Sequence, residues 1–128
     1  MGKPVLVDTD VLVDYLRGCG PAIAYVDQLA DGVLLSTIVI AELYAGVKGD
    51  QEQEILDEFV SLFRISPVTA EIARAAGLLK RDYGKAHGLG LADAILAATA
   101  ELENADLATL NVKHFPMIKG LKPAYVKR

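Results

Sequence analysis

Short apolar runs alternate along the chain with longer stretches whose apolar positions recur at helical spacing, a pattern that predicts strands alternating with helices. The predicted strands are residues 4–7, 33–35, 62–65 and 108–110, with residues 124–126 as the candidate for a fifth. Helical connections favour parallel neighbouring strands and leave helices on both faces of the sheet. We therefore expect an α/β fold with a central parallel sheet of four to five strands flanked by helices on both faces.

The predicted helices begin and end at capping residues and glycines. They span residues 11–17, 22–30, 38–47, 50–59, 70–83 and 91–103. Thr69 is expected to cap the fifth helix, and Asp50 with Gln53 resembles a capping pair for the fourth. A glycine-rich link, residues 84–90, follows the fifth helix. Because the chain has no visible repeat, low-complexity segment or linker, we expect a single domain over residues 1–128.

Polar residues gather where the predicted strands end. They are Asp8, Thr9 and Asp10 after the first strand, Thr37 after the second and Asn111 after the fourth. In open α/β sheets, ligands bind in the crevice beyond the carboxyl ends of the strands. A binding or catalytic site is therefore expected at this edge of the sheet.

Three acids stand alone in elements that are otherwise apolar. Asp8 directly follows the first strand, where a helix N-cap is the alternative to a functional role. Glu42 lies within residues 37–47, which are apolar on nearly every side, so we expect it to be buried or half-buried; an exposed stripe is the alternative. Asp93 lies near the start of residues 89–100, where the helix dipole also favours an anion.

The simplest common explanation for these acids is a bound divalent cation. Three unrelated caps in apolar elements would be a coincidence, whereas a cation would relieve the repulsion between converging carboxylates. Oxygen ligands without histidine or cysteine suit Mg²⁺ or Mn²⁺. Such ions activate a water molecule and stabilise charge on phosphate oxygens, so the pattern indicates phosphoryl chemistry.

Composition places the chain among compact proteins of a reducing compartment. It has 128 residues and is 52% hydrophobic, which excludes a disordered protein. The longest apolar runs are interrupted by Glu42 and Asp93, so none predicts a membrane span. The first apolar run is too short for a signal peptide, and the single cysteine, Cys19, allows no internal disulfide. We therefore expect a cytoplasmic protein with no membrane partner.

Basic residues are clustered although the net charge is −4. After Asp106 the chain has no acid, and its basic residues there are Lys113, Lys119, Lys122, Lys127 and Arg128. A second basic set comprises Arg64, Lys80, Arg81 and Lys85. Because nucleic-acid affinity depends on local phosphate contacts, one basic face could hold RNA on an acidic protein. A solvated tail and a solvated helix are the alternative.

Four segments carry a family pattern in their order and spacing. They are residues 5–12, 36–46, 91–100 and 107–115, and together they span nearly the whole chain. This pattern resembles PIN-domain ribonucleases, most closely the VapC type, the toxin half of bacterial and archaeal toxin–antitoxin pairs. The resemblance implies a PIN-like fold in which Asp8, Glu42 and Asp93 are catalytic, metal-binding acids. It also implies Mg²⁺- or Mn²⁺-dependent endonucleolytic hydrolysis of RNA by water.

The resemblance further implies protein partners. A VapC-type toxin is expected to form a homodimer, alone or within a higher assembly, and to be inhibited by a cognate antitoxin. The C-terminal segment of the antitoxin would enter the active-site groove. Its other end would bind the promoter DNA of the operon, so the toxin would meet DNA only through the antitoxin.

The chain departs from the family pattern after the fourth strand, where many relatives carry another aspartate and this chain has Asn111 and His114. We expect Asn111 to act in catalysis by orienting a water or reaching the phosphate, with one firmly held ion and a second arriving with the RNA. Thr9 and Thr109 would position the site or the substrate. His114 would contact phosphate or assist a leaving group, unless it only packs against a helix start. Further candidate phosphate contacts are Arg81, Lys85 and Lys113.

Two other functions fit parts of the pattern. A haloacid-dehalogenase-type phosphatase would use Asp8 as nucleophile and Asp10 as acid–base. That mechanism also needs a late acidic pair, but the only later aspartate after Asp93 is Asp106, which precedes the fourth strand. A catalytically inactive PIN-like domain that only binds RNA or a protein partner is the second alternative, suggested by the missing acid at Asn111.

Overall fold

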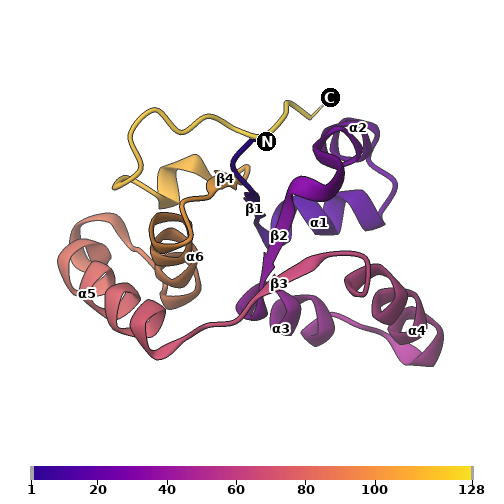
Figure 1. Ribbon diagram of the computed structural model, residues 1–128, viewed down its shortest axis with the longest axis horizontal. Helices are drawn as coiled ribbons and strands as arrows, with labels where there is room; N and C mark the ends of the chain where they lie inside the picture. The colour runs from indigo at the N-terminus through magenta and orange to yellow at the C-terminus, as the bar shows by residue number, and fades with distance from the viewer. Residues whose placement is uncertain (1, 128) are drawn as a thin grey trace.

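A computed structural model describes residues 2–127, in which a sheet lies between helices (Figure 1). The strands are β1 (Val5–Val7), β2 (Val33–Ser36), β3 (Arg64–Ser66) and β4 (Asp106–Ala108). The α-helices are α1 (Thr9–Leu16), α2 (Gly20–Leu29), α3 (Thr37–Ala45), α4 (Gly49–Val60), α5 (Ala70–His87) and α6 (Leu91–Leu102). Two 3₁₀ helices are η1 (Ala30–Gly32) and η2 (Val112–His114). The predicted α/β fold is confirmed.

The sheet is parallel and its strand order is β3-β2-β1-β4. From β1 the chain builds one side of the sheet through β2 and β3, then crosses through α5 and α6 to add β4 on the other side of β1. Figure 1 shows α5 and α6 together on one side of the sheet and α1 and α2 on the other. The order of strands therefore reverses at β1, where a crevice is expected between the carboxyl ends of β1 and β4. Val7 pairs with Ala108 there.

The core lies on both faces of the sheet. β2 is buried along its whole length, and Leu6, Val7 and Leu35 are fully buried. Small alanines on α6, such as Ala94 and Ala98, lie in a second cluster where α5 packs against α6. Burial on both faces explains why the central strands β1 and β2 are nearly continuous apolar runs and not alternating patterns.

One predicted helix start is confirmed and another is wrong. Thr69 caps α5 through its side chain, as expected. The capping pair of Asp50 and Gln53 is wrong, because α4 starts after Lys48 without a side-chain cap and Glu52 accepts a hydrogen bond from the Lys48 backbone N–H at 3.0 Å.

The helix α5 continues past Gly84 to His87, so the predicted link over residues 84–90 is too long. A glycine within a helix costs only modest stability, and packing against α6 outweighs that cost. The helix ends at Gly88, whose φ of 65° lies in the left-handed region that favours glycine. This extension carries the end of α5 to the start of α6.

The strand boundaries also shift. β3 begins and ends later than the predicted 62–65, and β4 ends at Ala108, where we had expected a strand over 108–110. Residues 124–126 form no strand, so the candidate fifth strand is wrong, although Ala124 N–H donates to Thr109 O at 3.0 Å. This backbone hydrogen bond lies beside the end of β4 and does not extend the sheet.

No helix within residues 2–127 is both long enough and apolar enough to cross a membrane.

Candidate active site

Asp8 lies where β1 ends and α1 begins. Its backbone N–H donates to Ala108 O at 2.9 Å, which continues the ladder between β1 and β4 by one bond. The carboxylate is 7% exposed and accepts from Thr9 N–H at 2.7 Å and from the Thr109 hydroxyl at 2.8 Å. Asp8 is therefore a helix cap, and its second oxygen faces the end of β4.

Thr109 connects the two sides of the crevice. It is fully buried, and its hydroxyl lies 2.8 Å from Asp8 Oδ2 but 3.4 Å from Asp10 Oδ2. One hydroxyl carries one proton, so the shorter contact with Asp8 is the principal hydrogen bond. The same oxygen accepts from Asn111 N–H at 3.1 Å. Thr109 thus orients the carboxylate of Asp8 and the loop that follows β4.

Asp10 is a site residue to which we had assigned a role only in the phosphatase alternative. Its Oδ1 accepts from Val11 N–H at 2.8 Å, and its Oδ2 accepts from Leu110 N–H at 3.0 Å and from the Asn111 side-chain amide at 3.1 Å. These bonds tie the start of α1 to the loop after β4. The signal that could have found it is its place after the first strand, but no local pattern shows that residue 111 lies beside residue 10.

Glu42 is exposed, so the expectation that it is buried or half-buried is wrong. The helix α3 is apolar nearly all round, but the rest of the chain covers only its Val39 and Leu43 side completely. The Glu42 carboxylate accepts from the Thr9 hydroxyl at 2.6 Å. The structure therefore brings Glu42 to Thr9, the residue after Asp8, and leaves it exposed.

Asp93 is half-buried in the first turn of α6. Its Oδ2 lies 3.2 Å from Nδ1 of His114, which belongs to η2 after β4. The structure therefore places His114 beside an acid of the site. Asn111, in contrast, is exposed and its amide nitrogen is bonded to Asp10.

The acids influence one another electrostatically. Burial raises the pKa of Asp8 to about 6, with a further contribution from the negative charge of Asp10 and opposition from the Thr109 and Thr9 hydrogen bonds. Burial also raises the pKa of Asp10, although several hydrogen bonds oppose it. Burial raises the pKa of Asp93 as well, with His114 acting against it and Glu42 and Asp10 adding to it.

Within residues 2–127, no lysine or arginine forms an ion pair with Asp8, Asp10, Glu42 or Asp93. In this range, no three side chains of aspartate, glutamate, histidine or cysteine lie close enough together to form a preformed metal site. The carboxylates thus share an electrostatic environment but stand apart, as repelling charges without a counter-ion do. An all-oxygen set of this kind, with lone pairs left free on exposed Glu42 and half-buried Asp93, fits a hard divalent cation.

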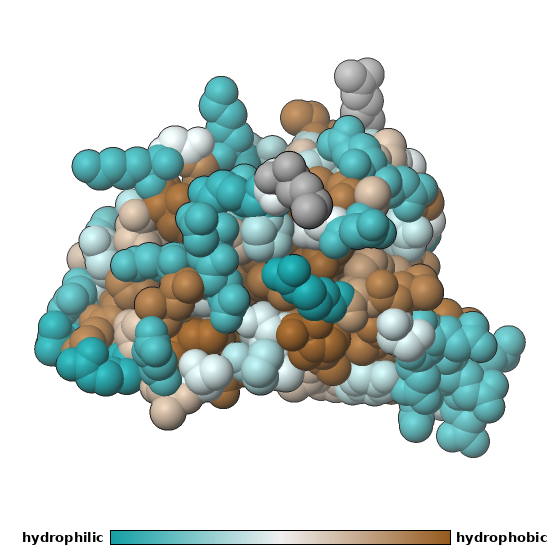
Figure 2. Space-filling model, in the orientation of Figure 1, coloured by the Kyte–Doolittle hydropathy of each residue, from teal (hydrophilic) through white to brown (hydrophobic). Residues whose placement is uncertain are grey.

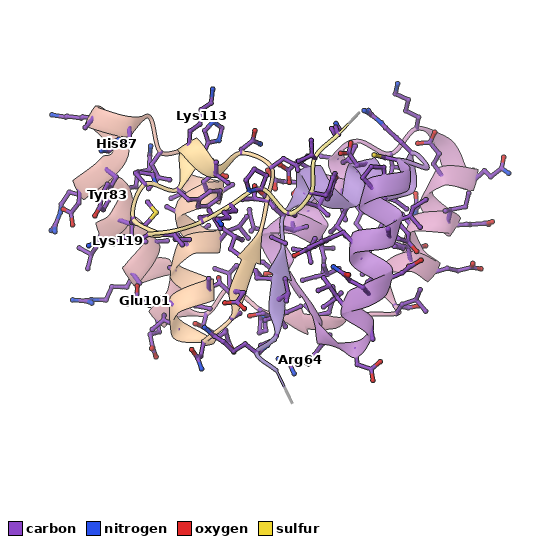
Figure 3. All side chains as sticks on the ribbon, turned by 90° about the horizontal axis from the view of Figure 1, so that it is seen from above. Arg64, Tyr83, His87, Glu101, Lys113 and Lys119 are labelled. Atoms are coloured by element: carbon purple, nitrogen blue, oxygen red, sulfur yellow. The ribbon has the colours of Figure 1, made fainter. Side chains whose placement is uncertain are left out.

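The predicted phosphate contacts lie in different places. Lys113 is exposed in η2, next to His114, and Figure 3 shows it at the same end of the molecule as His87. Lys85 is exposed in the last turn of α5. Arg81 forms an ion pair with Asp82 at 2.9 Å, so it is not brought to the acids.

A groove of about 380 Å³ starts at Glu42 and runs between α1, α3 and α4. Its apolar lining includes Leu16 and Ile55, which are 41% and 55% exposed. Arg17 and Glu52 lie along it as charged residues. The groove therefore joins an apolar surface to an acid of the site.

The PIN domain model matches residues 5–119. This chain belongs to the PIN-domain family. Within that family it is of the VapC type, because it is similar over most of its length to curated VapC proteins. It is 42% identical to Ribonuclease VapC10 and 40% identical to Ribonuclease VapC19, both of Mycobacterium tuberculosis, over 94% of this chain and 92% and 98% of the relatives.

Solved structures of the same type have the same fold. A toxin–antitoxin complex from Klebsiella pneumoniae contains a chain with a TM-score of 0.82 and 29% identity, covering 94% of this chain and 98% of the other. VapBC2 from Rickettsia felis, bound to a DNA fragment from its promoter, contains a chain with a TM-score of 0.75 and 28% identity, covering 91% and 94%. The family expected from the sequence segments is thus confirmed.

Proposed function

We propose that this PIN-domain protein is a metal-dependent endoribonuclease that acts as the toxin of a toxin–antitoxin pair. The observation that carries the proposal is the set of four carboxylates, Asp8, Asp10, Glu42 and Asp93, which influence one another electrostatically and form no ion pair with a lysine or arginine among residues 2–127. Uncompensated acids of this kind favour an external cation. The names of the VapC relatives supply the reaction class.

Asp8, Glu42 and Asp93 would hold Mg²⁺ or Mn²⁺ as one firmly bound ion, because three carboxylates are too few to compensate two tightly held divalent cations. When bound, the ion would activate a water molecule and stabilise negative charge on the phosphate that is cut. The absence of an acid at Asn111 and His114 agrees with a single ion.

The protein side chains would keep the acids in place. Thr109 orients Asp8, and Thr9 orients Glu42 through a 2.6 Å hydrogen bond. Asn111 gives its amide nitrogen to Asp10, so we propose that it acts in catalysis by fixing this loop, with its carbonyl oxygen left for water or substrate. Such outer contacts decide whether ligating groups have the right geometry.

RNA would cross the carboxyl edge of the sheet. Lys113 and Lys85, which are exposed near the start of α6, are the better placed of the predicted phosphate contacts. His114 would reach phosphate or a leaving group from its place beside Asp93. We propose a weaker role for Arg81, because its charge is already paired.

The groove from Glu42 between α1, α3 and α4 would receive the antitoxin. An apolar groove that includes Glu42 fits an extended segment with apolar side chains and one basic side chain at this acid. Solved complexes such as the one from Klebsiella pneumoniae are described as toxin–antitoxin complexes, which agrees with such a partner. Promoter DNA would be bound by the antitoxin and not by this chain.

A second copy of the chain would cover the remaining apolar surface. Figure 2 shows hydrophobic residues reaching the surface around α3 and β3, beside the hydrophilic α4. Ile65 is 38% exposed there, and Ala41 and Ala45 are exposed along α3. We propose a homodimer, free or within an assembly with the antitoxin, that works in the cytoplasm as a single-domain protein over residues 1–128.

The test is cleavage of a defined panel of transfer and ribosomal RNAs by the purified chain, free of antitoxin, with Mg²⁺ or Mn²⁺. We expect selective cuts that disappear in Asp8→Asn, while thermal unfolding shows that this variant is folded. If the native chain cuts no RNA with either metal, the non-catalytic PIN-like alternative replaces the proposal. Trapping of a phosphate on Asp8 during hydrolysis of a phosphate monoester would instead support the phosphatase.

A further inference from the structure

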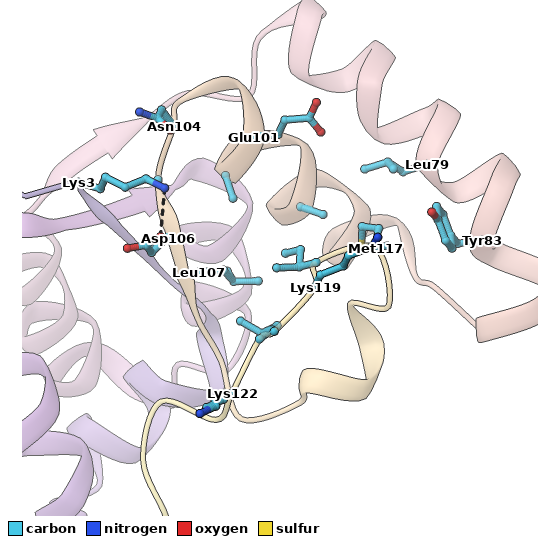
Figure 4. Close-up of a pocket in the computed structure, with 16 residues that line it drawn as sticks. Lys3, Leu79, Tyr83, Glu101, Asn104, Asp106, Leu107, Met117, Lys119 and Lys122 are labelled. Atoms are coloured by element: carbon cyan, nitrogen blue, oxygen red, sulfur yellow. Dashed lines mark ion pairs between the residues drawn. The ribbon is translucent and has the colours of Figure 1, made fainter.

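A second hollow lies on the α5–α6 side of the molecule, apart from the acids. This hollow, called the side pocket, has a volume of about 810 Å³ and lies between α5, α6, the start of β4 and the loop of residues 117–122 (Figure 4). Its lining includes Lys3, Tyr83, Asn104, Met117, Lys119 and Lys122. The volume is in the range of small-ligand sites, roughly 300–1,000 Å³.

The floor of the side pocket is apolar and one wall is aromatic. Leu79, Ala97 and Met117 line it, and Tyr83 lies at the end nearest the tip of α5. A flat ring can lie on such a floor and stack against a tyrosine, as bases do on proteins that bind single-stranded nucleic acid. The shape therefore suits a nucleobase better than a compact ion.

The rim of the side pocket carries more positive than negative charge. Lys119 and Lys122 are exposed and form no ion pair within residues 2–127. The acid Asp106 is compensated by Lys3 at 3.3 Å, the pair drawn in Figure 4. Glu101 is the remaining acid on the lining, and it can accept hydrogen bonds from a ribose hydroxyl or a base amino group. Two uncompensated ammonium groups above an apolar floor fit the phosphates and base of a nucleotide.

Residues between the side pocket and the active site lie at one end of the molecule. Tyr83 packs against His87 with ring centroids 5.8 Å apart. Figure 3 shows His87 and Lys113 at the same end of the molecule, and Lys113 precedes the His114 that contacts Asp93. Basic and aromatic residues thus lead from the acids, past the tip of α5, to Lys119.

We propose that the side pocket is a second RNA contact that holds a nucleotide of the single-stranded substrate away from the cut bond. The base lies on the apolar floor beside Tyr83, and the phosphates lie against Lys119 and Lys122. This inference rests on the proposed ribonuclease function, because it assigns RNA as the occupant. It adds a site that touches no acid of the active site and tightens binding without taking part in hydrolysis.

The first experiment measures RNA binding by the full chain carrying Asp8→Asn, so that the RNA stays intact. Fluorescence anisotropy is recorded with a mixed-sequence ten-nucleotide single-stranded RNA over a range of KCl concentrations. Adding Lys119→Ala with Lys122→Ala should weaken binding about tenfold and reduce the slope of log affinity against log salt by about 1.4, the value for two phosphate contacts on a single strand. Lys48→Ala with Arg74→Ala removes two exposed charges outside the side pocket and outside the basic residues considered for RNA binding, and is the control; it should leave the slope unchanged.

A stacking series tests the base. Tyr83→Leu should weaken RNA binding about fivefold or more, and Tyr83→Phe, which keeps the ring, should bind like the parent. The unfolding temperature of each variant shows that it is folded. If Tyr83→Phe and Tyr83→Leu bind alike, or if the pocket binds a free nucleoside monophosphate while the lysine variants leave RNA affinity unchanged, the proposal is wrong.

The second experiment uses the active chain. Lys119→Ala with Lys122→Ala should raise KM for a long RNA and leave kcat and the cut position as they are, since the pocket lies away from the reacting atoms. Unchanged KM would overturn the side pocket proposal alone. Failure of Asp8→Asn to abolish cleavage would overturn the proposed function alone, so the two outcomes are separate.

Discussion

Asp8 and Asp14 are two acids at either end of one short helix, and they are equally buried at 7% exposure. Their partners differ. Among residues 2–127, Asp8 accepts hydrogen bonds only from neutral groups, a backbone N–H and the Thr109 hydroxyl. Asp14 accepts from the Tyr125 hydroxyl at 2.6 Å and pairs with the Lys127 ammonium at 3.1 Å.

Because their partners differ, the pKa values of Asp8 and Asp14 are shifted in opposite directions. Burial raises the pKa of Asp8 to about 6. Burial would also raise the pKa of Asp14, but the Tyr125 and Lys127 contacts outweigh it and hold this pKa below its ordinary value. A buried acid that the chain itself compensates has a structural role. Here Asp14 binds the C-terminal tail to α1, and we call this set of bonds the Asp14 contact. A buried acid that the chain leaves uncompensated is a candidate for an external cation.

The largest expected effect separates the two acids by activity. Asp8→Asn should lower RNA cleavage about a thousandfold or more, the scale of losing a principal electrostatic group in an active site. Asp14→Asn should keep cleavage within about threefold, because Asp14 has its own partners. The measurement is the initial rate on one RNA with saturating Mg²⁺. An equal loss in both variants would mean that Asp14 is part of the catalytic site.

The next effect is a pH dependence of stability without metal. The pKa of Asp8 is about 6 in the folded chain against an ordinary value of 3.8, so the folded state holds the proton more strongly. Asp8 therefore contributes about 3 kcal/mol to the free energy of unfolding below pH 3.8. This contribution is lost as pH rises through 6.

Comparing Asp8→Asn with the native chain by denaturant unfolding between pH 4 and 8 checks this effect, and the variant should show a flatter profile. Asp14 has the opposite sign: its contribution is present above 3.8 and is lost as pH falls through its lower folded pKa. Removing Asp14 should therefore lower the free energy of unfolding above pH 3.8 and change the slope of the profile only at the acidic end. Parallel profiles for the native chain and Asp8→Asn would contradict the raised pKa of Asp8, and with it the difference between Asp8 and Asp14.

Magnesium should stabilise the native chain, because only the folded state brings the acids together. At a concentration one hundred times its Kd, the gain is about 2.7 kcal/mol. Thermal unfolding with Mg²⁺ and with EDTA measures it. Asp14→Asn should keep this gain and Asp8→Asn should lose most of it; a gain that survives in Asp8→Asn would place the ion elsewhere.

A smaller effect on stability is expected at the Asp14 contact. Tyr125→Phe removes the hydroxyl that donates to Asp14 and should lower the free energy of unfolding by about 1.5 kcal/mol, the scale of a hydrogen bond to a charged group. Urea unfolding at pH 7 is the measurement. Tyr44→Phe removes a hydroxyl from the exposed bond to Asp57 and is a matched control with a smaller expected loss.

The smallest effect is at Lys127. Its side chain is 56% exposed, so solvent screens its pair with Asp14. Lys127→Ala should cost less than about 1 kcal/mol, as for other ion pairs at the surface. High salt should reduce this cost further, and a salt-independent cost would show that packing of the long side chain is what matters.

The sequence by itself determined the features whose signals are local. Apolar runs at strand length, the cap at Thr69 and the alternation of elements were enough for the parallel α/β fold, because each depends on neighbouring residues. Asp8 and Asp93 could be selected for the same reason, as each is the lone acid of an apolar element. The order of the motif segments was enough for the PIN family.

Only the tertiary structure decided what depends on distant segments. The bonds of Asp10 to residues after β4 span about a hundred positions of chain, and no local pattern records them. Glu42 is exposed because no other segment covers its side of α3, and burial is a property of the neighbours of a helix, not of its own sequence. Asp8 and Asp14 are both acids beside apolar residues in the sequence; their opposite pKa shifts arise only when the tail brings Tyr125 and Lys127 to one of them.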